Sequence, residues 1–387
     1  MGSAIALAVW ASLWLLPWQP HRTRERFETR PLPASEVMGA DLSSVCVVIP
    51  ARNEADRLPS TLAALACQGR DLRVLIVDDE SSDATGAVAE SAGRELAKGS
   101  ADPARAMDVT VVPGRPLAQG WGGKLWALQQ GFERVDRPAV LLLDADIELA
   151  PGVLPCLLAE AHARDVQLYS IMATLRCESF WERLLVPPFI FFFKLLYPFA
   201  CANDRGSRVA AAAGGLVLLD AQALRAIGGF EPIRDALIDD CSLAAAFKRQ
   251  GYGTWLGLSR SIRSTRAYPG LGEFWRMVSR TAFTQLKYST VLLLLASLTM
   301  LLVFVVPLTA LAASPWSSQG AFGLAAWLAM SLAYLPVVTF YRLPVLWTLS
   351  LPFAAVLFLA MTWSSAIAYW RGTRARWKDR AYQAPRL

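Results

Sequence analysis

The sequence predicts an α/β fold, a mostly parallel sheet with helices on both faces, flanked by membrane segments at both ends. From residue 45 onward, short apolar runs alternate with amphipathic segments, and polar residues follow each apolar run directly. Such alternation of strands and helices implies right-handed crossovers and parallel strands. Long apolar stretches near both termini predict the membrane segments.

The composition is that of a membrane protein. Hydrophobic residues make up 54% of the 387 residues, charged residues only 18%, and the mean hydropathy is +0.34. A wholly soluble chain is less apolar, and 14 Trp and 17 Phe are typical of anchors at the membrane interface. The net charge is +6, but the basic residues cluster beside apolar runs, so we expect no nucleic-acid partner.

The cysteine and histidine content restricts the chemistry. The six cysteines are scattered without a Cys-x-x-Cys pair, which favours reduced thiols over disulfides or a zinc site. His21 and His162 are the only histidines in the sequence. Proton transfer is therefore expected to fall on carboxylates.

Residues 1–20 are predicted to be an uncleaved membrane anchor. A signal peptide carries its charge before the apolar core and ends at a small-residue cleavage site. Here the charges follow the core, at Arg22, Arg24, Arg26 and Arg30. This basic flank predicts that the anchor's carboxyl end is cytoplasmic. Residues 21–44, which contain Pro and Ser, read as a linker.

Residues 45–287 are predicted to form the cytosolic domain. Its first strands are expected at Val45–Ile49, Leu72–Val77, Val109–Val112 and Val140–Leu143, with helices through Leu58–Leu65, Ala84–Leu96 and Leu125–Phe132 between them. A helix at Pro151–Ala163 and extended segments at Val166–Leu175 and Ala211–Leu219 follow. Gly214-Gly215 in the last of these predicts a close approach to the backbone.

Acidic residues follow three of these strands. Asp144 and Asp146 lie two residues apart, so in an extended segment they point the same way and can share Mg²⁺ or Mn²⁺ carrying a diphosphate. A loop in which two acids only solvate the strand end is the alternative. Glu54, Asp78 and Asp79 follow the first two strands, and parallel strands bring such residues to one edge.

A lysine is expected near these acids. Lys124 ends the Gly-rich segment 120–124, which can cradle phosphate or be an ordinary turn. Converging acids repel one another unless a cationic or hydrogen-bonding ligand joins them. A nucleotide with a divalent metal meets both needs.

Four ordered motifs resemble the family 2 inverting glycosyltransferases of the GT-A fold. They are Val-Ile-Pro-Ala-Arg-Asn-Glu (48–54), Val-Asp-Asp-Glu-Ser-Ser-Asp (77–83), Asp-Ala-Asp (144–146) and Gly-Gly-Phe (228–230). The resemblance covers about residues 45–290 and implies a nucleotide-sugar donor, UDP-linked by family preference. It places Pro50 and Ala51 at the uracil pocket, Asp79 at the base with Asp78 beside it, Asp144 at the ribose or metal, and Asp146 on the metal.

The resemblance also assigns the proton transfer. Asp239 and Asp240 open a helix, where the dipole favours carboxylates, and a plain helix cap is the alternative. The family carries a Glu/Asp-Asp pair here whose second acid is the catalytic base, and that role falls on Asp240. Lys124 and the metal then stabilise the departing diphosphate, and a single displacement inverts the anomeric configuration.

Two further segments are expected at the membrane surface. The aromatic-rich run at about 178–202 contains paired prolines and Lys194, which favours an interfacial helix or hairpin over a regular span; a buried core helix is the alternative. Arg276 and Arg280 lie in an amphipathic segment. We expect them either to bind the donor or to form a plain basic surface. Processive relatives have a Gln-x-x-Arg-Trp motif here, and its absence speaks against polymer synthesis.

The carboxyl-terminal region 288–370 contains three apolar segments, at about 289–313, 321–341 and 346–370. The basic tail 371–387 is expected to be cytoplasmic, yet three crossings would put it outside. The second or third segment is therefore expected to be re-entrant or interfacial, unless the charge rule is broken. These features predict a multi-pass protein of the inner membrane whose catalytic domain faces the cytoplasm.

The acceptor is expected to be a lipid, because the apolar run 178–202 lies in the sequence between the metal-site and base motifs. The chain most resembles the hopene-associated glycosyltransferases of hopanoid biosynthesis, through residues 120–127, 210–215 and 275–286. Ceramide, carotenoid and polyprenyl phosphate are alternative acceptors. A non-catalytic nucleotide-sugar-binding membrane protein and a transporter are alternatives of other classes. The sequence leaves the oligomeric state open.

Overall fold

The computed structural model describes residues 1–29, 33–99, 102, 105–372, 376–377 and 380–381. They form two compact units, each described by itself. The α/β unit is built chiefly from Glu25–Leu175 and Cys201–Arg266, and the helical unit from Met1–Arg24, Arg176–Ala200 and Ala267–Ala375. The second main segment of the α/β unit runs to Arg266, and most of the run at 178–202 belongs to the helical unit. The predicted domain bounds 45–287 stay a prediction.

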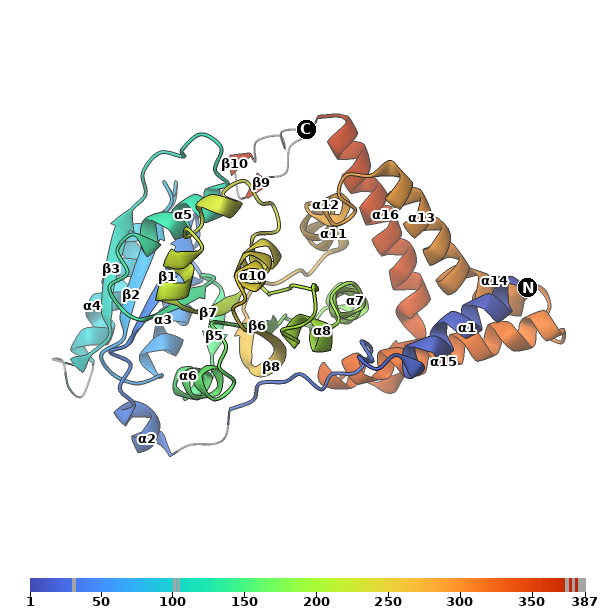
Figure 1. Cartoon of the computed structure of the whole chain (residues 1–387), viewed down its shortest axis with the longest axis horizontal. Coiled ribbons are helices and arrows are strands. Elements are labelled where there is room, and N and C mark those ends of the chain that lie inside the picture. The colour runs from blue at the N-terminus through green and yellow to red at the C-terminus, as the bar shows by residue number, and fades with distance from the viewer. Residues whose placement is uncertain (30–32, 100–101, 103–104, 373–375, 378–379, 382–387) are drawn as a thin grey trace. The chain divides into compact units, whose positions relative to one another are not determined.

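A mixed sheet forms the centre of the α/β unit (Figure 1). Among the described residues it has eight strands in the order β3-β2-β1-β4-β7-β6-β8-β5. The first four are mutually parallel, as predicted, whereas β7 runs antiparallel to both of its neighbours. The strands are β1 Val45–Ala51, β2 Arg73–Asp78, β3 Asp108–Pro113, β4 Ala139–Leu143, β5 Ile147–Leu149, β6 Leu168–Thr174, β7 Leu216–Asp220 and β8 Thr254–Ser264.

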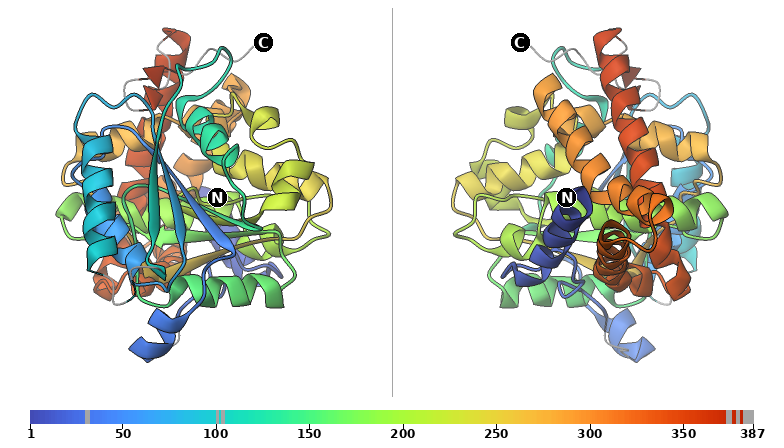
Figure 2. Two further views of the ribbon diagram at one scale, coloured as in Figure 1. Left: turned by 90° about the vertical axis from the view of Figure 1, so that its left-hand side faces the viewer. Right: turned by 90° about the vertical axis from the view of Figure 1, so that its right-hand side faces the viewer.

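Helices cover both faces of this sheet, as the sequence predicts (Figures 1 and 2). Side chains alternate along β1, so that Val45, Val47 and Ile49 face one side, and Cys46 and Val48 the other. The first side packs against α3 Leu58–Ala66, α4 Thr85–Lys98 and α6 Val153–Ala163. The second side packs against α5 Gly123–Phe132, α9 Ala221–Ala226 and α10 Asp239–Arg249.

Three local predictions need correction. The strand expected at 211–219 begins only at Leu216, and Gly214-Gly215 form a turn before it. Lys124 lies in the first turn of α5 rather than in the preceding loop. Strand β8 was not predicted, although its first six residues are buried and supply the second partner strand of β6.

Most of the aromatic-rich segment forms a helix of the helical unit, α7 Phe180–Leu196, and a second, short helix, α8 Phe199–Asn203, follows it. A capping box between Ser179 and Glu182 starts α7, since each side chain accepts a hydrogen bond from the other residue's backbone N–H. Glu182 also accepts the N–H of Tyr268 at 2.8 Å. Phe191 stacks on Trp10 of helix α1 (Gly2–Leu15). The predicted interfacial location of α7 stays a prediction.

Among the described residues of the helical unit, three helices are long and apolar enough to cross a membrane: Thr290–Ala313, Ser318–Phe340 and Val345–Trp370. They comprise α13 Thr290–Met300, a π-helical turn at Leu301–Val305, α14 Val306–Ala313, α15 Ser318–Phe340, a 3₁₀ turn at Val345–Ser350 and α16 Leu351–Trp370. By length alone none needs to be re-entrant. Most of the basic tail 371–387 lies outside the described residues.

The amino-terminal helix α1 packs against α14 and α15 within this unit (Figure 2, right). Its 14 residues extend about 21 Å, less than the hydrocarbon thickness of roughly 30 Å. The predicted anchor at 1–20 stays a prediction, and this helix alone is short for a full crossing.

One hydrogen bond joins α1 to the first long helix. Pro307 has no N–H to give the carbonyl of Val303 four residues earlier, and the intervening turn is π-helical. The indole N–H of Trp10 donates to that carbonyl at 3.1 Å, in a buried position. Trp10 thus supplies the hydrogen bond that the proline removes.

We expect Trp10→Phe to lower the unfolding temperature in detergent, because it leaves a buried carbonyl without its donor, at a cost of about 1–3 kcal/mol. Trp14→Phe on the same helix is the control, since Trp14 is 39% exposed. Differential scanning fluorimetry compares the two variants, and equal stability would contradict the role given to Trp10.

Candidate active site

Two loops at the carboxyl ends of β1 and β2 interlock. The guanidinium of Arg52 donates to the carbonyls of Asp79 and Glu80, and the N–H of Asn53 donates to the Ser81 hydroxyl at 3.0 Å. Asn53 and Glu80 both have positive φ, of 53° and 50°, a conformation that these contacts hold. These contacts hold the two loops against each other.

The predicted base-binding residues lie together at this edge. Pro50 and Ala51 pair with Val77 and Asp78 across β1 and β2, and the N–H of Asp79 donates to the Ala51 carbonyl at 2.8 Å. The carboxylate of Asp79 is fully buried, 4.0 Å from the Arg52 guanidinium. The carboxyl ends of the two strands thus bring all four predicted residues side by side.

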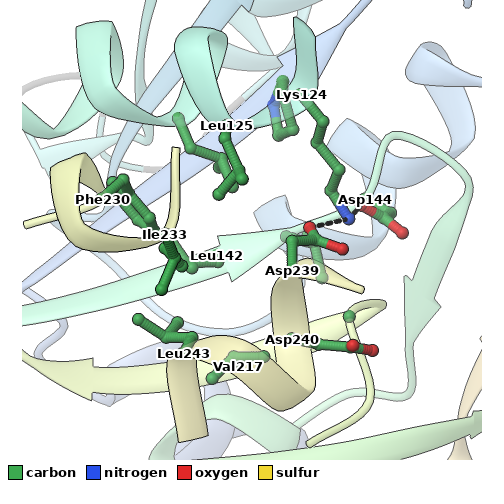
Figure 3. Close-up of a pocket in the computed structure, with 14 residues that line it drawn as sticks. Lys124, Leu125, Leu142, Asp144, Val217, Phe230, Ile233, Asp239, Asp240 and Leu243 are labelled. Atoms are coloured by element: carbon green, nitrogen blue, oxygen red, sulfur yellow. Dashed lines mark ion pairs between the residues drawn. The ribbon is translucent and has the colours of Figure 1, made fainter. Parts of the chain in front are cut away.

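Lys124 joins the metal-site and base motifs within one pocket (Figure 3). Its Nζ lies 2.9 Å from Oδ1 of Asp144, at the end of β4, and 3.4 Å from Oδ2 of Asp239, at the start of α10. Burial alone would lower the pKa of Lys124, but Asp144, Asp239 and Asp240 together raise it above its ordinary value. Lys124 is therefore a fixed positive charge between these acids.

Asp240 has the properties of a general base. Burial first, and then the charge of Asp239, raise its pKa to about 6. Its Oδ1 accepts the N–H of Cys241 at 2.7 Å. This hydrogen bond and one from the backbone of Gly214 partly oppose the rise in pKa. A carboxylate with a pKa this close to neutrality accepts protons better than an exposed one and is still charged at pH 7.

Gly214 allows this arrangement. A Cβ atom there would lie 3.3 Å from Nζ of Lys124 and 3.4 Å from Oδ2 of Asp240. The close backbone approach that the glycine pair predicts is found at this position. A larger side chain would crowd the space between the cation and the base.

Asp146 and Glu54 meet through an arginine that the sequence-based reasoning missed. Oδ2 of Asp146 lies 2.7 Å from the Ser264 hydroxyl and 3.2 Å from Nε of Arg266. Nη2 of Arg266 lies 2.8 Å from Oε1 of Glu54. Ser264 ends the unpredicted strand β8, and a polar residue after an apolar strand is the signal that could have identified this edge.

The two acids expected to share a cation thus have separate partners, Lys124 for Asp144 and Arg266 for Asp146. Within the described part of the chain, no three His, Cys, Asp or Glu residues are grouped so that they could hold a metal ion. Burial raises the pKa of Asp144, Lys124 opposes this, and the charge of Asp146 adds to it. Mg²⁺ typically binds one or two carboxylates together with substrate phosphates and water. The residues therefore fit an ion brought with a diphosphate, not an all-protein cage.

Arg276 and Arg280 belong to the helical unit. Arg276 lies on α11 (Leu271–Ser279), is largely exposed and lies 3.7 Å from Glu273, while Arg280 follows the helix as its cap. The amphipathic helix is found as predicted. Donor binding by these arginines stays a prediction.

Residues 46–228 match the family model described as glycosyl transferase family 2. Over these residues the chain is similar to the family 2 glycosyltransferases. The matched part contains the strand ends that carry Asp78, Asp79, Asp144 and Asp146, whereas Asp239 and Asp240 lie just beyond it.

Two curated relatives match over shorter stretches. One is the 4,4'-diaponeurosporenoate glycosyltransferase of Staphylococcus haemolyticus, 32% identical over 29% of this chain and 26% of the relative. The other is the undecaprenyl-phosphate 4-deoxy-4-formamido-L-arabinose transferase of Klebsiella pneumoniae, 33% identical over 35% of this chain and 37% of the relative. The match thus spans about a quarter to just over a third of these relatives.

Among solved structures, a mannosyltransferase from Pyrobaculum calidifontis in complex with GDP-Man and Mn²⁺ is similar with a TM-score of 0.51. The similarity covers 92% of this chain and 98% of that chain, at 20% identity. At this identity the likeness concerns the fold. Together with the family match, it confirms the predicted GT-A fold class.

We expect Lys124→Met to destabilise the protein by about 1–3 kcal/mol at pH 8, because it leaves Asp144, Asp239 and Asp240 without their shared, partly buried cation. Without Lys124 the pKa values of Asp144 and Asp240 rise further, so the loss should shrink as the pH falls through about 6 and these two acids become neutral. Thermal unfolding in EDTA at several pH values measures this. Lys98→Met, at an exposed position, is the control, and a pH-independent loss would contradict the account.

Proposed function

We propose that the protein is a membrane-bound, metal-dependent, inverting glycosyltransferase. It transfers a sugar from a nucleotide-sugar, UDP-linked by family preference, to a hydroxyl group of a lipid. The observation that carries this proposal is the pocket in which Lys124, Asp144, Asp239 and Asp240 come together. A fixed cation beside a base with a raised pKa is what displacement of a diphosphate by a hydroxyl requires.

The donor binds along the carboxyl edge of the sheet. Pro50, Ala51 and Asp79 hold the nucleotide base on the interlocked loops. Asp144 and Asp146 would hold Mg²⁺ or Mn²⁺, which supplies positive charge to the diphosphate when bound. Lys124 contributes a second positive charge to the same leaving group.

Asp240 performs the proton transfer. As the acceptor oxygen attacks the anomeric carbon from the face opposite the diphosphate, Asp240 takes the hydroxyl proton and the bond to the diphosphate oxygen breaks. One such displacement converts an α-linked donor into a β-linked product. Asp239 keeps Lys124 in place and raises the pKa of its neighbour.

A lipid alcohol is the acceptor that best agrees with this site. The three long apolar helices support a membrane acceptor, and the curated relatives are named for a carotenoid acid and for undecaprenyl phosphate. A phosphate acceptor is already ionised at neutral pH and needs no base, whereas a hydroxyl does. The base Asp240 therefore favours a hydroxyl acceptor, and the hopanoid resemblance makes a polycyclic terpenoid alcohol our first choice over carotenoid, ceramide and polyprenyl phosphate.

We further propose that the protein resides in the inner membrane with the α/β unit on the cytoplasmic side. The basic residues that follow α1 support this orientation through the positive-inside rule.

The test of the reaction uses purified protein in lipid, a panel of nucleotide-sugars and total bacterial lipid extract, with and without EDTA. Mass spectrometry of the lipids should show one new glycolipid, formed from one preferred donor and lost in EDTA. Soluble glycosides, or no product with any donor, would contradict the proposal.

We expect Asp240→Asn to reduce turnover by about 10²–10⁴-fold, because the amide cannot accept the proton, while nucleotide-sugar affinity stays near that of the wild type. Asp220→Asn is the control, since Asp220 is also an acid at a helix start, where it caps α9. A non-catalytic nucleotide-sugar-binding protein would show no turnover in either form, and full activity of the Asp240→Asn variant would exclude Asp240 as the base.

The rate should depend on pH through Asp240. Its pKa of about 6 means that it is charged and competent above pH 6 and is protonated below. The value of kcat/KM is therefore expected to fall toward tenfold per pH unit below pH 6. Asp239→Asn removes a like charge and should move this limb to lower pH. A flat profile down to pH 5 would contradict the assignment.

A further inference from the structure

Arg266 connects two buried acids that come from different strand ends. Its guanidinium reaches Oδ2 of Asp146, just after β4, and Oε1 of Glu54, after β1. These acids are only 6% and 5% exposed, and the Arg266 side chain is 29% exposed. Two buried carboxylates at one edge are costly without a cation, and Arg266 provides one.

The position of this cation is set by its own strand end. The Arg266 N–H donates to the Ser264 hydroxyl at 3.2 Å, and the same hydroxyl donates to Oδ2 of Asp146 at 2.7 Å. The Asp146 oxygen therefore receives both a hydroxyl proton and a guanidinium N–H. A divalent ion that used this oxygen would have to displace one of the two donors, and it would repel the nearby guanidinium.

We infer that Arg266 is a positioning residue that competes with the divalent ion for Asp146, so that the free protein binds the ion weakly and the diphosphate carries it in. This inference rests on the proposed role of Asp146 as a metal ligand. Glu54 keeps the arginine at the site when its contact with Asp146 is lost. The negatively charged diphosphate then offers the guanidinium a new partner.

This arrangement predicts positive coupling between metal and nucleotide. Part of the metal's binding free energy is spent on separating Arg266 from Asp146, and a bound nucleoside diphosphate reduces that cost. Removing Arg266 should therefore strengthen metal binding in the absence of nucleotide and weaken the coupling between the two ligands.

The experiment measures Mn²⁺ binding by the full chain in nanodiscs, from the electron paramagnetic resonance signal of free Mn²⁺. Without nucleotide, Arg266→Gln is expected to bind Mn²⁺ about tenfold more tightly than the wild type, the equivalent of one charge-assisted hydrogen bond. Arg263→Gln is the matched control, because Arg263 is exposed on the same strand. Unchanged or weaker Mn²⁺ binding by Arg266→Gln would overturn the inference.

Two further measurements guard against a merely structural effect. In the double variant Arg266→Gln/Asp146→Asn the gain should disappear, and a gain that persists would place the extra ion elsewhere and overturn the inference. Arg266→Lys keeps a charge but loses the forked contact to two acids, so we expect a smaller gain. If Arg266→Gln folds poorly, the Arg266→Lys variant decides. A Mn²⁺ affinity of Arg266→Lys equal to that of the wild type would then overturn the inference.

The same titrations with UDP and with GDP give the coupling directly. The increase in Mn²⁺ affinity caused by the nucleotide should be larger in the wild type than in Arg266→Gln, and equal increases would overturn the inference. The lipid transfer assay separates this result from the proposed function. Loss of metal competition with normal transfer would reject only the role of Arg266, whereas competition without transfer would reject only the enzymatic proposal.

Discussion

The pairing of acids with fixed cations at the edge of the sheet is the constraint on which the α/β unit depends. Parallel strands bring Glu54, Asp144 and Asp146 to one edge, where they would repel one another in a poorly solvated space. Lys124 from the first turn of α5 and Arg266 from the end of β8 offset this repulsion. Lys124 also lines the pocket that we propose for the diphosphate, so under this proposal one side chain serves both the stability of the fold and the chemistry.

Close backbone approach is the second constraint. A Cβ on Gly131 would lie 2.4 Å from the side chain of Val48, so only glycine lets α5 lie this near to β1. The position of Lys124, on the same helix, follows from that packing. The space at Gly214 is less restricted, since a Cβ there would lie 3.3 Å from Nζ of Lys124 and 3.4 Å from Oδ2 of Asp240. The position of the charged side chains at the site therefore depends also on the small size of these glycines.

The sequence predicted the parallel half of the sheet well, because each strand there is a local apolar run followed by a helix with a regular hydrophobic pattern. It predicted the other half less well. Strand β8 was missed although a polar residue follows its apolar run, and its partners β6 and β5 are more than eighty residues away in the sequence. Arg266 was missed because the two acids that it contacts precede it in the sequence by 120 and 212 residues.

The sequence alone determined which residues carry charge, which segments are apolar enough to cross a membrane and which acids follow the parallel strands, because these properties are local. The tertiary structure decided which charges meet. It gave Asp144 and Asp146, neighbours in sequence, two different cations, and it placed Asp240 beside a lysine more than a hundred residues earlier. Such pairings depend on the order and direction of strands across the sheet, which long-range packing sets.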